Sequence, residues 1–294
     1  MKKTILIATH SGGFHPDDVC AVATLSIYLK GNFRLVRTRD PKVLAKADYV
    51  VDVGGKFSVK KKLFDHHQPG GGGVRGNKIP YASFGLVWKT FGKKICGSAQ
   101  VAKAIDEKLV QSIDAIDNGI DIVDSKSHVY PYLFGYALSS QLPTWKEQVD
   151  IDKVFLKTVA IAKNVIEREI IRERHKRESE RFVRTAYMKA KDKRIVILGK
   201  NYAWGEVLSL YPEPLLVLYP QEHNWHVKAV RDSARSFKNR IDFPRLWAGK
   251  RVEELREITG VSDAQFCHTN RFLAVAKSRE GAMALARLAL SPHH

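Results

Sequence analysis

The chain has 294 residues, 44% hydrophobic and 27% charged, which is enough for two globular domains of ordinary size. No apolar run approaches the length of a membrane span, and three cysteines without a C-x-x-C pair exclude a disulfide framework or a zinc ribbon, so we expect a cytoplasmic protein. The net charge of +18 favours nucleic acid or a phosphorylated substrate as partner, although a basic proteome or plain solubility would produce the same excess.

The N-terminal part of the chain alternates short apolar runs with helical stretches. The apolar runs are rich in β-branched residues and predict strands at residues 4–9, 33–38, 47–55 and 60–64. Glycines and a proline predict a loop after the first run, followed by a helix over residues 19–30 that Asp17 or Asp18 can cap. This order of elements predicts an α/β fold, with a parallel sheet and crossover helices.

Acids and imidazoles follow the ends of three predicted strands. They are His10, His15 and Asp17 after the first strand, Asp52 at the end of the third, and Asp65, His66 and His67 after the fourth. Open α/β sheets bind ligands beyond the carboxyl ends of their strands, so we expect these clusters to converge on one crevice. Carboxylates combined with imidazoles suit Mn²⁺, Zn²⁺ or Fe²⁺. Taken alone, the Asp-His-His stretch is equally compatible with a capped turn carrying surface histidines.

Two helices are predicted next, over residues 83–91 and 101–116. The second leads into Asp114 and Asp117, which lie three residues apart and share one helical face. One of these carboxylates could complete a metal site. Taken alone, the pair is explained more simply as solvation of a helix end.

A long, charge-laced helix is predicted over residues 151–194, and we expect it to be a solvated spacer that can also touch a nucleic-acid backbone. A second domain follows, with strands predicted at residues 194–198, 215–219 and 226–230. Near its end, Ser278 opens a helix whose N-terminus could receive a phosphate beside Arg279. An ordinary capped helix explains the same residues, and both interpretations stay open.

The ordered set of motifs resembles the DHH phosphoesterase superfamily, and within it the Myg branch, whose eukaryotic members are described as 3′–5′ RNA exonucleases. The matching stretches are Thr9-His10-x-Gly-x-Phe14-His15-x-Asp17, Val51-Asp52-Val-Gly-Gly55, Phe64-Asp65-His66-His67-Gln68, Ser83-x-Gly85-Leu-Val87, Asp114-Ala-Ile-Asp117-Asn-Gly-Ile120, Trp225-x-Val-x-Ala-Val230, Ser236-Phe237, Trp247-x-Gly-x-Arg-x-Glu-Glu-Leu255 and Lys277-Ser-Arg-Glu-Gly-Ala282. The resemblance implies a catalytic metal-binding domain over residues 1–150, a linker helix over 151–191 and a smaller α/β substrate-binding domain over 192–294.

The resemblance also implies a site with two divalent ions, Mn²⁺ preferred and Mg²⁺ or another transition ion as the alternative. The implied metal ligands are His10, His15, Asp17, Asp52, His66 and Asp117. Asp52 would bridge the ions and, with His66 and His67, make up the catalytic set, while Asp65 and Asp18 would support the ligands from behind. His67 would face the scissile phosphate. Substrate would be held by His67, His268 and Arg279, with Arg231, Lys238 and Arg240 as further basic candidates.

The function expected from this resemblance is a metal-dependent phosphodiesterase, a 3′–5′ exonuclease acting on RNA or short oligonucleotides through metal-activated water. One alternative is a small-molecule phosphoesterase or pyrophosphatase, which would need no basic exterior. Another is a nucleic-acid-binding protein whose metal site is not catalytic. The sequence predicts no membrane partner, and it allows a homodimer.

Overall fold

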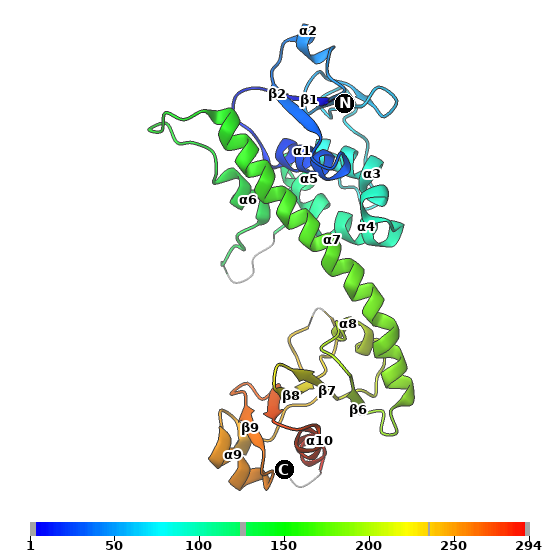
Figure 1. The fold of residues 1–294 in the computed structure, drawn as a ribbon, viewed down its shortest axis with the longest axis vertical. Coiled ribbons are helices and arrows are strands. Elements are labelled where there is room, and N and C mark those ends of the chain that lie inside the picture. Colours follow the sequence, from blue (N-terminus) through cyan, green and yellow to red (C-terminus); the bar gives the residue numbers. More distant parts are fainter. Residues whose placement is uncertain (1–3, 124–127, 235, 292–294) are drawn as a thin grey trace. The chain divides into compact units, whose positions relative to one another are not determined.

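The computed structural model describes residues 4–123, 128–234 and 236–291. The chain divides into two compact units, Met1–Arg174 and His175–His294, and each is described by itself below (Figure 1). Both units combine one sheet with helices, so the predicted mixed α/β fold is confirmed. Among the described helices, none is both long enough and apolar enough to cross a membrane.

The first unit is built on a five-stranded sheet with the order β2-β1-β3-β5-β4. Its strands are β1 (Ile5–Thr9), β2 (Phe33–Arg37), β3 (Tyr49–Val51), β4 (Phe57–Ser58) and β5 (Leu63–Phe64). The first three and β5 pair in parallel, as predicted. The sequence analysis missed β4, a two-residue edge strand antiparallel to β5. The parallel order places the carboxyl ends of β1, β3 and β5 side by side at one edge of the sheet.

The sheet and the helices that follow form the core of the first unit, to which every one of these helices except the short α2 (Pro41–Leu44) contributes buried side chains. The helices are α1 (Pro16–Tyr28), α2, α3 (Ser83–Cys96), α4 (Ala99–Ile105), the π-helical turn η1 (Asp106–Val110), α5 (Gln111–Asp117) and α6 (Phe134–Ser139). The predicted helix over residues 101–116 is therefore interrupted by η1. A π-turn inserts an extra residue into the helical repeat and shifts the faces that follow it, so the face of α5 cannot be extrapolated from α4.

Helix α1 begins earlier than the sequence analysis predicted. Pro16 occupies its first turn, where the missing N–H of proline needs no partner. The carboxylate of Asp18 reaches back from the third helical position and accepts a hydrogen bond from the backbone N–H of His15 at 2.8 Å. The prediction that Asp17 could cap this helix was wrong, since Asp17 accepts its hydrogen bonds from Ser83 and Phe84 instead.

Helix α7 (Ile151–Lys189) is a single 39-residue helix, drawn in green in Figure 1. Its first half contributes buried side chains to the core of the first unit, among them Phe155 and Ile166. Its last turns contribute Val183 and Tyr187 to a core of the second unit. The charged stretch between them, residues 171–178, is exposed or half-buried, so the predicted solvated character applies to the middle of the helix and not to its ends.

The second unit contains a five-stranded sheet with the order β6-β7-β8-β10-β9. The strands are β6 (Ile195–Ile197), β7 (Leu216–Gln221), β8 (Asn224–Ala229), β9 (Ala264–Cys267) and β10 (Leu273–Ala276). Only β6 and β7 pair in parallel; the other neighbours are antiparallel. The helices are α8 (Gly205–Leu208), the 3-10 turn η2 (Arg245–Trp247), α9 (Val252–Thr259) and α10 (Arg279–Ala289). The sequence analysis missed β9 and β10, which are only four residues long.

Candidate metal centre

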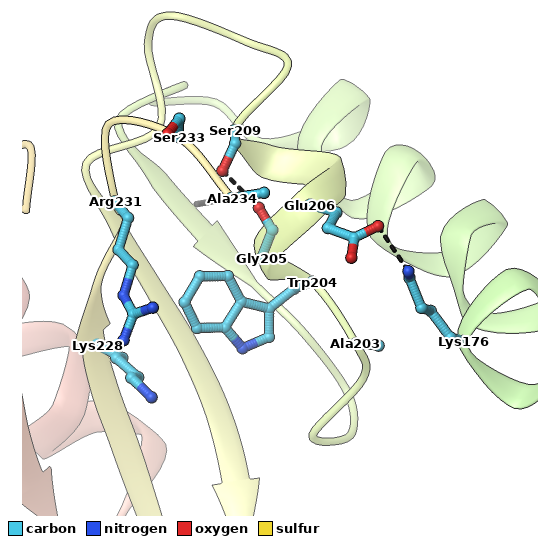
Figure 2. Close-up of a pocket in the computed structure, with 10 residues that line it drawn as sticks. All are labelled: Lys176, Ala203, Trp204, Gly205, Glu206, Ser209, Lys228, Arg231, Ser233 and Ala234. Atoms are coloured by element: carbon cyan, nitrogen blue, oxygen red, sulfur yellow. Dashed lines mark hydrogen bonds and ion pairs between the residues drawn. The ribbon is translucent and has the colours of Figure 1, made fainter. Parts of the chain in front are cut away.

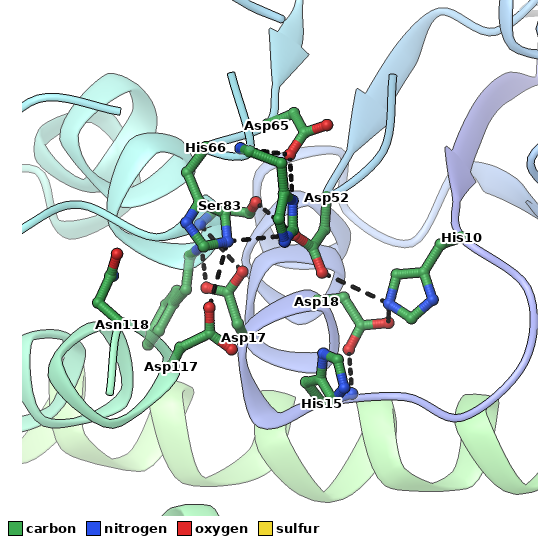
Figure 3. A network of polar contacts seen from close by, with 12 residues as sticks. His10, His15, Asp17, Asp18, Asp52, Asp65, His66, Ser83, Asp117 and Asn118 are labelled. Atoms are coloured by element: carbon green, nitrogen blue, oxygen red, sulfur yellow. Dashed lines mark hydrogen bonds and ion pairs between the residues drawn. The ribbon is translucent and has the colours of Figure 1, made fainter. Parts of the chain in front are cut away.

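Three strand ends bring acids and imidazoles together in the first unit, as Figure 3 shows. His10 follows β1, Asp52 follows β3 and His66 follows β5. The Nε2 atom of His10 lies 3.4 Å from Oδ2 of Asp52, and the Nε2 atom of His66 lies 3.5 Å from Oδ1 of the same carboxylate. His66 Nε2 is also 3.2 Å from Oδ2 of Asp117, at the end of α5. The predicted convergence of the three clusters is therefore present.

The backbone at Asp52 is adapted to this position. Its φ is +54°, in the left-handed region that residues other than glycine seldom adopt, and Gly54 follows with a φ of +95°. Strained backbone of this kind is found preferentially at functional sites. The hydroxyl of Ser83, at the start of α3, donates to Oδ1 of Asp52 at 3.1 Å. The backbone conformation of Asp52 and the hydroxyl of Ser83 in α3 thus together position the buried carboxylate.

The candidate ligand atoms form three overlapping groups, in each of which one atom per residue lies within 4.8 Å of the others. The groups are His10, His15 and Asp52; Asp52, His66 and His67; and Asp17, His66 and Asp117. Asp52 belongs to the first two groups and His66 to the last two. The two oxygens of Asp52 face different groups, Oδ2 towards His10 and Oδ1 towards His66.

The buried imidazoles provide a test of whether a cation fits here. The Nε2 atoms of His10 and His66 lie within 3.5 Å of carboxylate oxygens but have no partner in hydrogen-bonding geometry. Buried nitrogen and oxygen atoms that face each other without a hydrogen bond are placed as ligands around an ion would be. Mixed imidazole and carboxylate donors suit a divalent transition ion, so the residues fit such an ion.

The electrostatics of the cluster also favour a cation. Burial lowers the pKa of His10, but the carboxylates of Asp18 and Asp52 outweigh this effect and raise the pKa to about 10. Burial also lowers the pKa of His66, but the carboxylates of Asp117 and Asp52 outweigh this effect and raise the pKa to about 10. Burial raises the pKa of Asp17, and the nearby carboxylates add to the increase. The negative charge responsible for these shifts would be neutralised by divalent cations.

The two consecutive aspartates at the start of α1 contact different parts of the first unit. Both oxygens of Asp17 accept backbone N–H groups at the N-terminus of α3, from Ser83 at 2.9 Å and from Phe84 at 2.6 Å. Asp18 accepts from the backbone of His15 through Oδ1 and presents Oδ2 to Nε2 of His10 at 3.2 Å. Asp18 therefore faces the same nitrogen of His10 as Asp52 does, while Nδ1 of His10 lies 3.2 Å from the backbone carbonyl oxygen of Ser11. The supporting role of Asp18 stays a prediction.

Asp65 and His67 form a pair at the edge of the cluster. Oδ1 of Asp65 lies 2.7 Å from Nδ1 of His67, and Oδ2 accepts the backbone N–H of Gly55 at 2.6 Å. The His67 side chain is 61% exposed, and its Nδ1 is 3.5 Å from Oδ1 of Asp52. The buried Asp65 thus orients an exposed imidazole beside the candidate metal ligands.

A buried ion pair of Asp114 and Arg75 supports the cluster. The sequence analysis considered Asp114 only as a possible metal ligand alongside Asp117. Asp114 is fully buried, and its Oδ2 lies 2.7 Å from Nη2 of Arg75. Oδ1 of Asp114 accepts the backbone N–H of Gly85 at 3.0 Å. A Cβ atom at Gly85 would overlap the Asp114 carboxylate, which explains the glycine in the Ser83-x-Gly85 motif. Of the two acids near the end of α5, Asp117 belongs to the ligand cluster and Asp114 to its support.

The basic residues predicted to bind substrate in the second unit do not share one cavity. Arg231 lines a cavity of about 320 Å³ together with Lys228 and Trp204, and Figure 2 shows Arg231 and Lys228 next to each other beside the indole. Arg279 lines a different cavity, of about 510 Å³. Lys238 is exposed and lies 3.3 Å from a carboxylate oxygen of Asp232.

The remaining predicted substrate contacts have internal partners. The guanidinium of Arg240 donates to the backbone carbonyls of Ser209, Tyr211 and Pro214. His268 accepts the backbone N–H of Asn270 through Nδ1 at 3.0 Å. These contacts fix the positions of both side chains within the second unit, and a role of Arg240 and His268 in substrate binding stays a prediction.

The N-terminus of α10 is already capped by the chain. Ser278 Oγ accepts the backbone N–H of Gly281, and Asp263 Oδ2 accepts the backbone N–H of Ser278 at 2.7 Å. A carboxylate at this point repels a phosphate, so the structure favours the ordinary capped helix over a phosphate site.

Known proteins resemble this chain over nearly its whole length. A family model described as "Uncharacterised protein family (UPF0160)", MYG1_exonuc, matches residues 6–290. The chain is 32% identical to the MYG1 protein C694.04c of Schizosaccharomyces pombe, covering 99% of this chain and 98% of that protein. It is 29% identical to the MYG1 exonuclease of Mus musculus, covering 97% and 84%.

Among solved structures, the chain is similar to exonuclease RecJ bound to manganese, with 14% identity over 97% of this chain and 89% of that one. The TM-score is 0.27. The family model and the yeast relative cover the chain almost completely, and they confirm the predicted relationship. The chain belongs to the MYG1 family.

Proposed function

We propose that this protein is a metal-dependent phosphodiesterase that removes nucleotides from RNA or short oligonucleotides in the 3′–5′ direction. The observation that carries the proposal is the position of Asp52, which forms one candidate ligand group with His10 and His15 and a second with His66 and His67. His66 in turn groups with Asp17 and Asp117. Paired ligand groups that share one carboxylate are the arrangement that a two-ion phosphoryl-transfer site requires.

The candidate ligands and their neighbours would have different roles in the reaction. Asp52 would be shared by two ions, and the other members of each group would complete the binding of one ion each. Divalent ions held there would activate a water molecule and stabilise the charge that develops on the phosphate during in-line displacement. His67, exposed and oriented by Asp65, would contact the scissile phosphate. Ser83 would hold Asp52 in place through the bond to Oδ1.

Two observations support a nucleic-acid substrate. The relative from Mus musculus is named an exonuclease, and the net charge of +18 suits a polyanionic polymer. Arg231 and Lys238 would contribute to this attraction from the second unit, and Arg279 would grip the substrate. The mixture of imidazole and carboxylate ligands would favour Mn²⁺ over Mg²⁺. A cytoplasmic location is part of the same proposal.

The test begins with protein stripped of metal by a chelator. It is incubated with 5′-labelled RNA and DNA oligonucleotides and Mn²⁺, Mg²⁺ or no added ion, with pyrophosphate hydrolysis measured in parallel. The expected result is a ladder of RNA products shortened from the 3′ end, dependent on Mn²⁺ and absent from the Asp52→Asn variant. Glu107→Gln, which changes an exposed acid of the same unit, is the matched control and should remain active. Phosphate release from pyrophosphate alone, or RNA binding without cleavage under any metal, would contradict the proposal.

A further inference from the structure

A cavity of about 320 Å³ opens beside the candidate metal centre in the first unit, and its lining combines polar and apolar residues. The polar part includes three side chains of the ligand groups, His15, Asp17 and Asp117, together with Ser139. The apolar part carries an aromatic ring and consists of Pro16, Ile113, Ile116, Gly135 and Tyr136. The volume lies at the lower end of the roughly 300–1,000 Å³ range of small-molecule sites, so the cavity holds a ligand of about nucleotide size.

The apolar part of the lining forms where α6 packs against α1 and α5. A Cβ atom at Gly135 would lie at ordinary van der Waals distance from Ile113 and Pro16, 3.4 Å from Cδ1 and 3.6 Å from Cγ, so α6 is in close contact with both neighbours. Ile113 is buried, and it forms part of the core that supports this wall. The cavity wall is therefore built on packed helices, which is the kind of support that a binding site needs.

Tyr136 is the aromatic residue in the apolar part of the cavity lining. It lies in α6, lines the cavity and is 47% exposed. The ring of Tyr132 lies edge-on to it, with centroids 6.1 Å apart and an interplanar angle of 65°. The Tyr132 hydroxyl also donates to the backbone carbonyl of Tyr136 at 3.3 Å. A half-exposed aromatic ring beside an apolar surface offers a flat face on which a nucleobase can stack.

We propose that this cavity is the subsite for the terminal nucleobase of the strand, with Tyr136 as its stacking residue. The inference rests on the proposed function and specifies its substrate class. A phosphate held by divalent ions at His15 and Asp117 would place the attached nucleoside against the apolar part of the lining. Inorganic pyrophosphate has no group that would gain from Tyr136 and Ile116, whereas a base gains from both. The subsite is indifferent to base identity, because every base has a π-face.

The test is a cycle that changes the enzyme and the substrate independently. Wild type, Tyr136→Ala and Tyr136→Phe are assayed with Mn²⁺ on oligonucleotides whose 3′-terminal nucleotide carries a base or is abasic. For the substrate with a terminal base, Tyr136→Ala should lower kcat/KM about tenfold, within the range of about 5- to 150-fold that base–aromatic stacking provides. Tyr136→Phe should keep wild-type activity. On the abasic substrate, wild type and Tyr136→Ala should be equal.

A second measurement does not depend on activity. Binding of the two oligonucleotides to the full chain is followed by fluorescence anisotropy in the presence of Mn²⁺, with a non-cleavable methylenephosphonate as the 3′-terminal linkage so that no hydrolysis occurs. Tyr136→Ala should weaken binding of the oligonucleotide with a terminal base and leave binding of the abasic one unchanged. Tyr130→Ala is the matched control, because Tyr130 comes from the same segment, is 72% exposed and does not line the cavity.

The outcomes separate the subsite from the catalytic proposal. If Tyr136→Ala loses activity and affinity equally on both substrates, or on neither, Tyr136 does not stack on the terminal base and the subsite is refuted. If wild type cleaves no oligonucleotide, the proposed function fails, and the anisotropy cycle still decides whether the cavity recognises a base. If Tyr130→Ala matches Tyr136→Ala in both assays, the effect belongs to the segment and the assignment to Tyr136 is overturned.

Discussion

Replacement of Asp52 by asparagine separates a shared metal ligand from an ordinary buried acid. Asparagine keeps the size of the side chain but removes its charge and one anionic oxygen, and so weakens the ligand groups of both His10 and His66. Substitution of a residue that only hydrogen-bonds to a metal ligand weakens metal binding by roughly 10- to 100-fold. Substitution of a ligand shared by two ions should therefore weaken binding by at least about 100-fold.

The consequence can be worked out for thermal unfolding. Mn²⁺ at 100 times its dissociation constant stabilises the wild type by about 2.7 kcal/mol, whereas a variant with 100-fold weaker binding gains only about 0.4 kcal/mol. For a unit the size of Met1–Arg174, each kcal/mol shifts the melting temperature by roughly 2–4 °C. The rise caused by Mn²⁺ should therefore fall from roughly 5–11 °C to about 1 °C.

Differential scanning calorimetry with and without Mn²⁺ measures this rise. Glu107→Gln removes a negative charge from an exposed position of the same unit and should keep the full rise, which controls for the change in net charge. A full Mn²⁺-dependent rise in Asp52→Asn would refute the reasoning, because it would show that the ion binds without this carboxylate. Loss of the rise in both variants would point to general electrostatic attraction instead of a defined site.

Three further variants test the support of the cluster. Ser83→Ala removes the 3.1 Å hydrogen bond to Asp52 and should weaken Mn²⁺ binding about tenfold by isothermal titration calorimetry; unchanged affinity would exclude that role. Gly85→Ala places a methyl group against the Asp114 carboxylate and should lower the free energy of unfolding by about 1–3 kcal/mol in urea; a wild-type midpoint would contradict the packing. Arg75→Met leaves Asp114 buried without its cation, at a cost of about 3–5 kcal/mol. Burial raises the pKa of Asp114 to about 7 despite Arg75, and a raised folded-state pKa means that stability is lost as pH rises. The deficit should therefore be larger at pH 8 than at pH 5, and a pH-independent deficit would count against it.

The sequence was sufficient to predict the convergence of His10, Asp52 and His66, because that prediction depends on a general rule. Parallel strands end at the same edge of a sheet, so residues that follow β1, β3 and β5 meet regardless of the loops between them. The same rule could not separate Asp114 from Asp117. They share a helical face in sequence, yet Asp117 lies at the ligand cluster and Asp114 is buried against Arg75. Arg75 is far from Asp114 in the chain, and no local pattern links such a pair.

The consecutive acids Asp17 and Asp18 show how such long-range contacts prepare the site. The side chains of adjacent helical residues point about 100° apart, so one can form hydrogen bonds within its own helix while the other forms them with a neighbouring helix. Asp18 bonds within α1, and Asp17 accepts two backbone N–H groups of α3. Ser83 then adds a bond to Asp52 from the same helix end. The N-terminus of α3 therefore positions two carboxylates at once, and they belong to different candidate ligand groups. Since backbone N–H groups hold Asp17 and the Ser83 hydroxyl holds Asp52, an ion would bind to groups that are already oriented, and little of its binding free energy would be spent on ordering them.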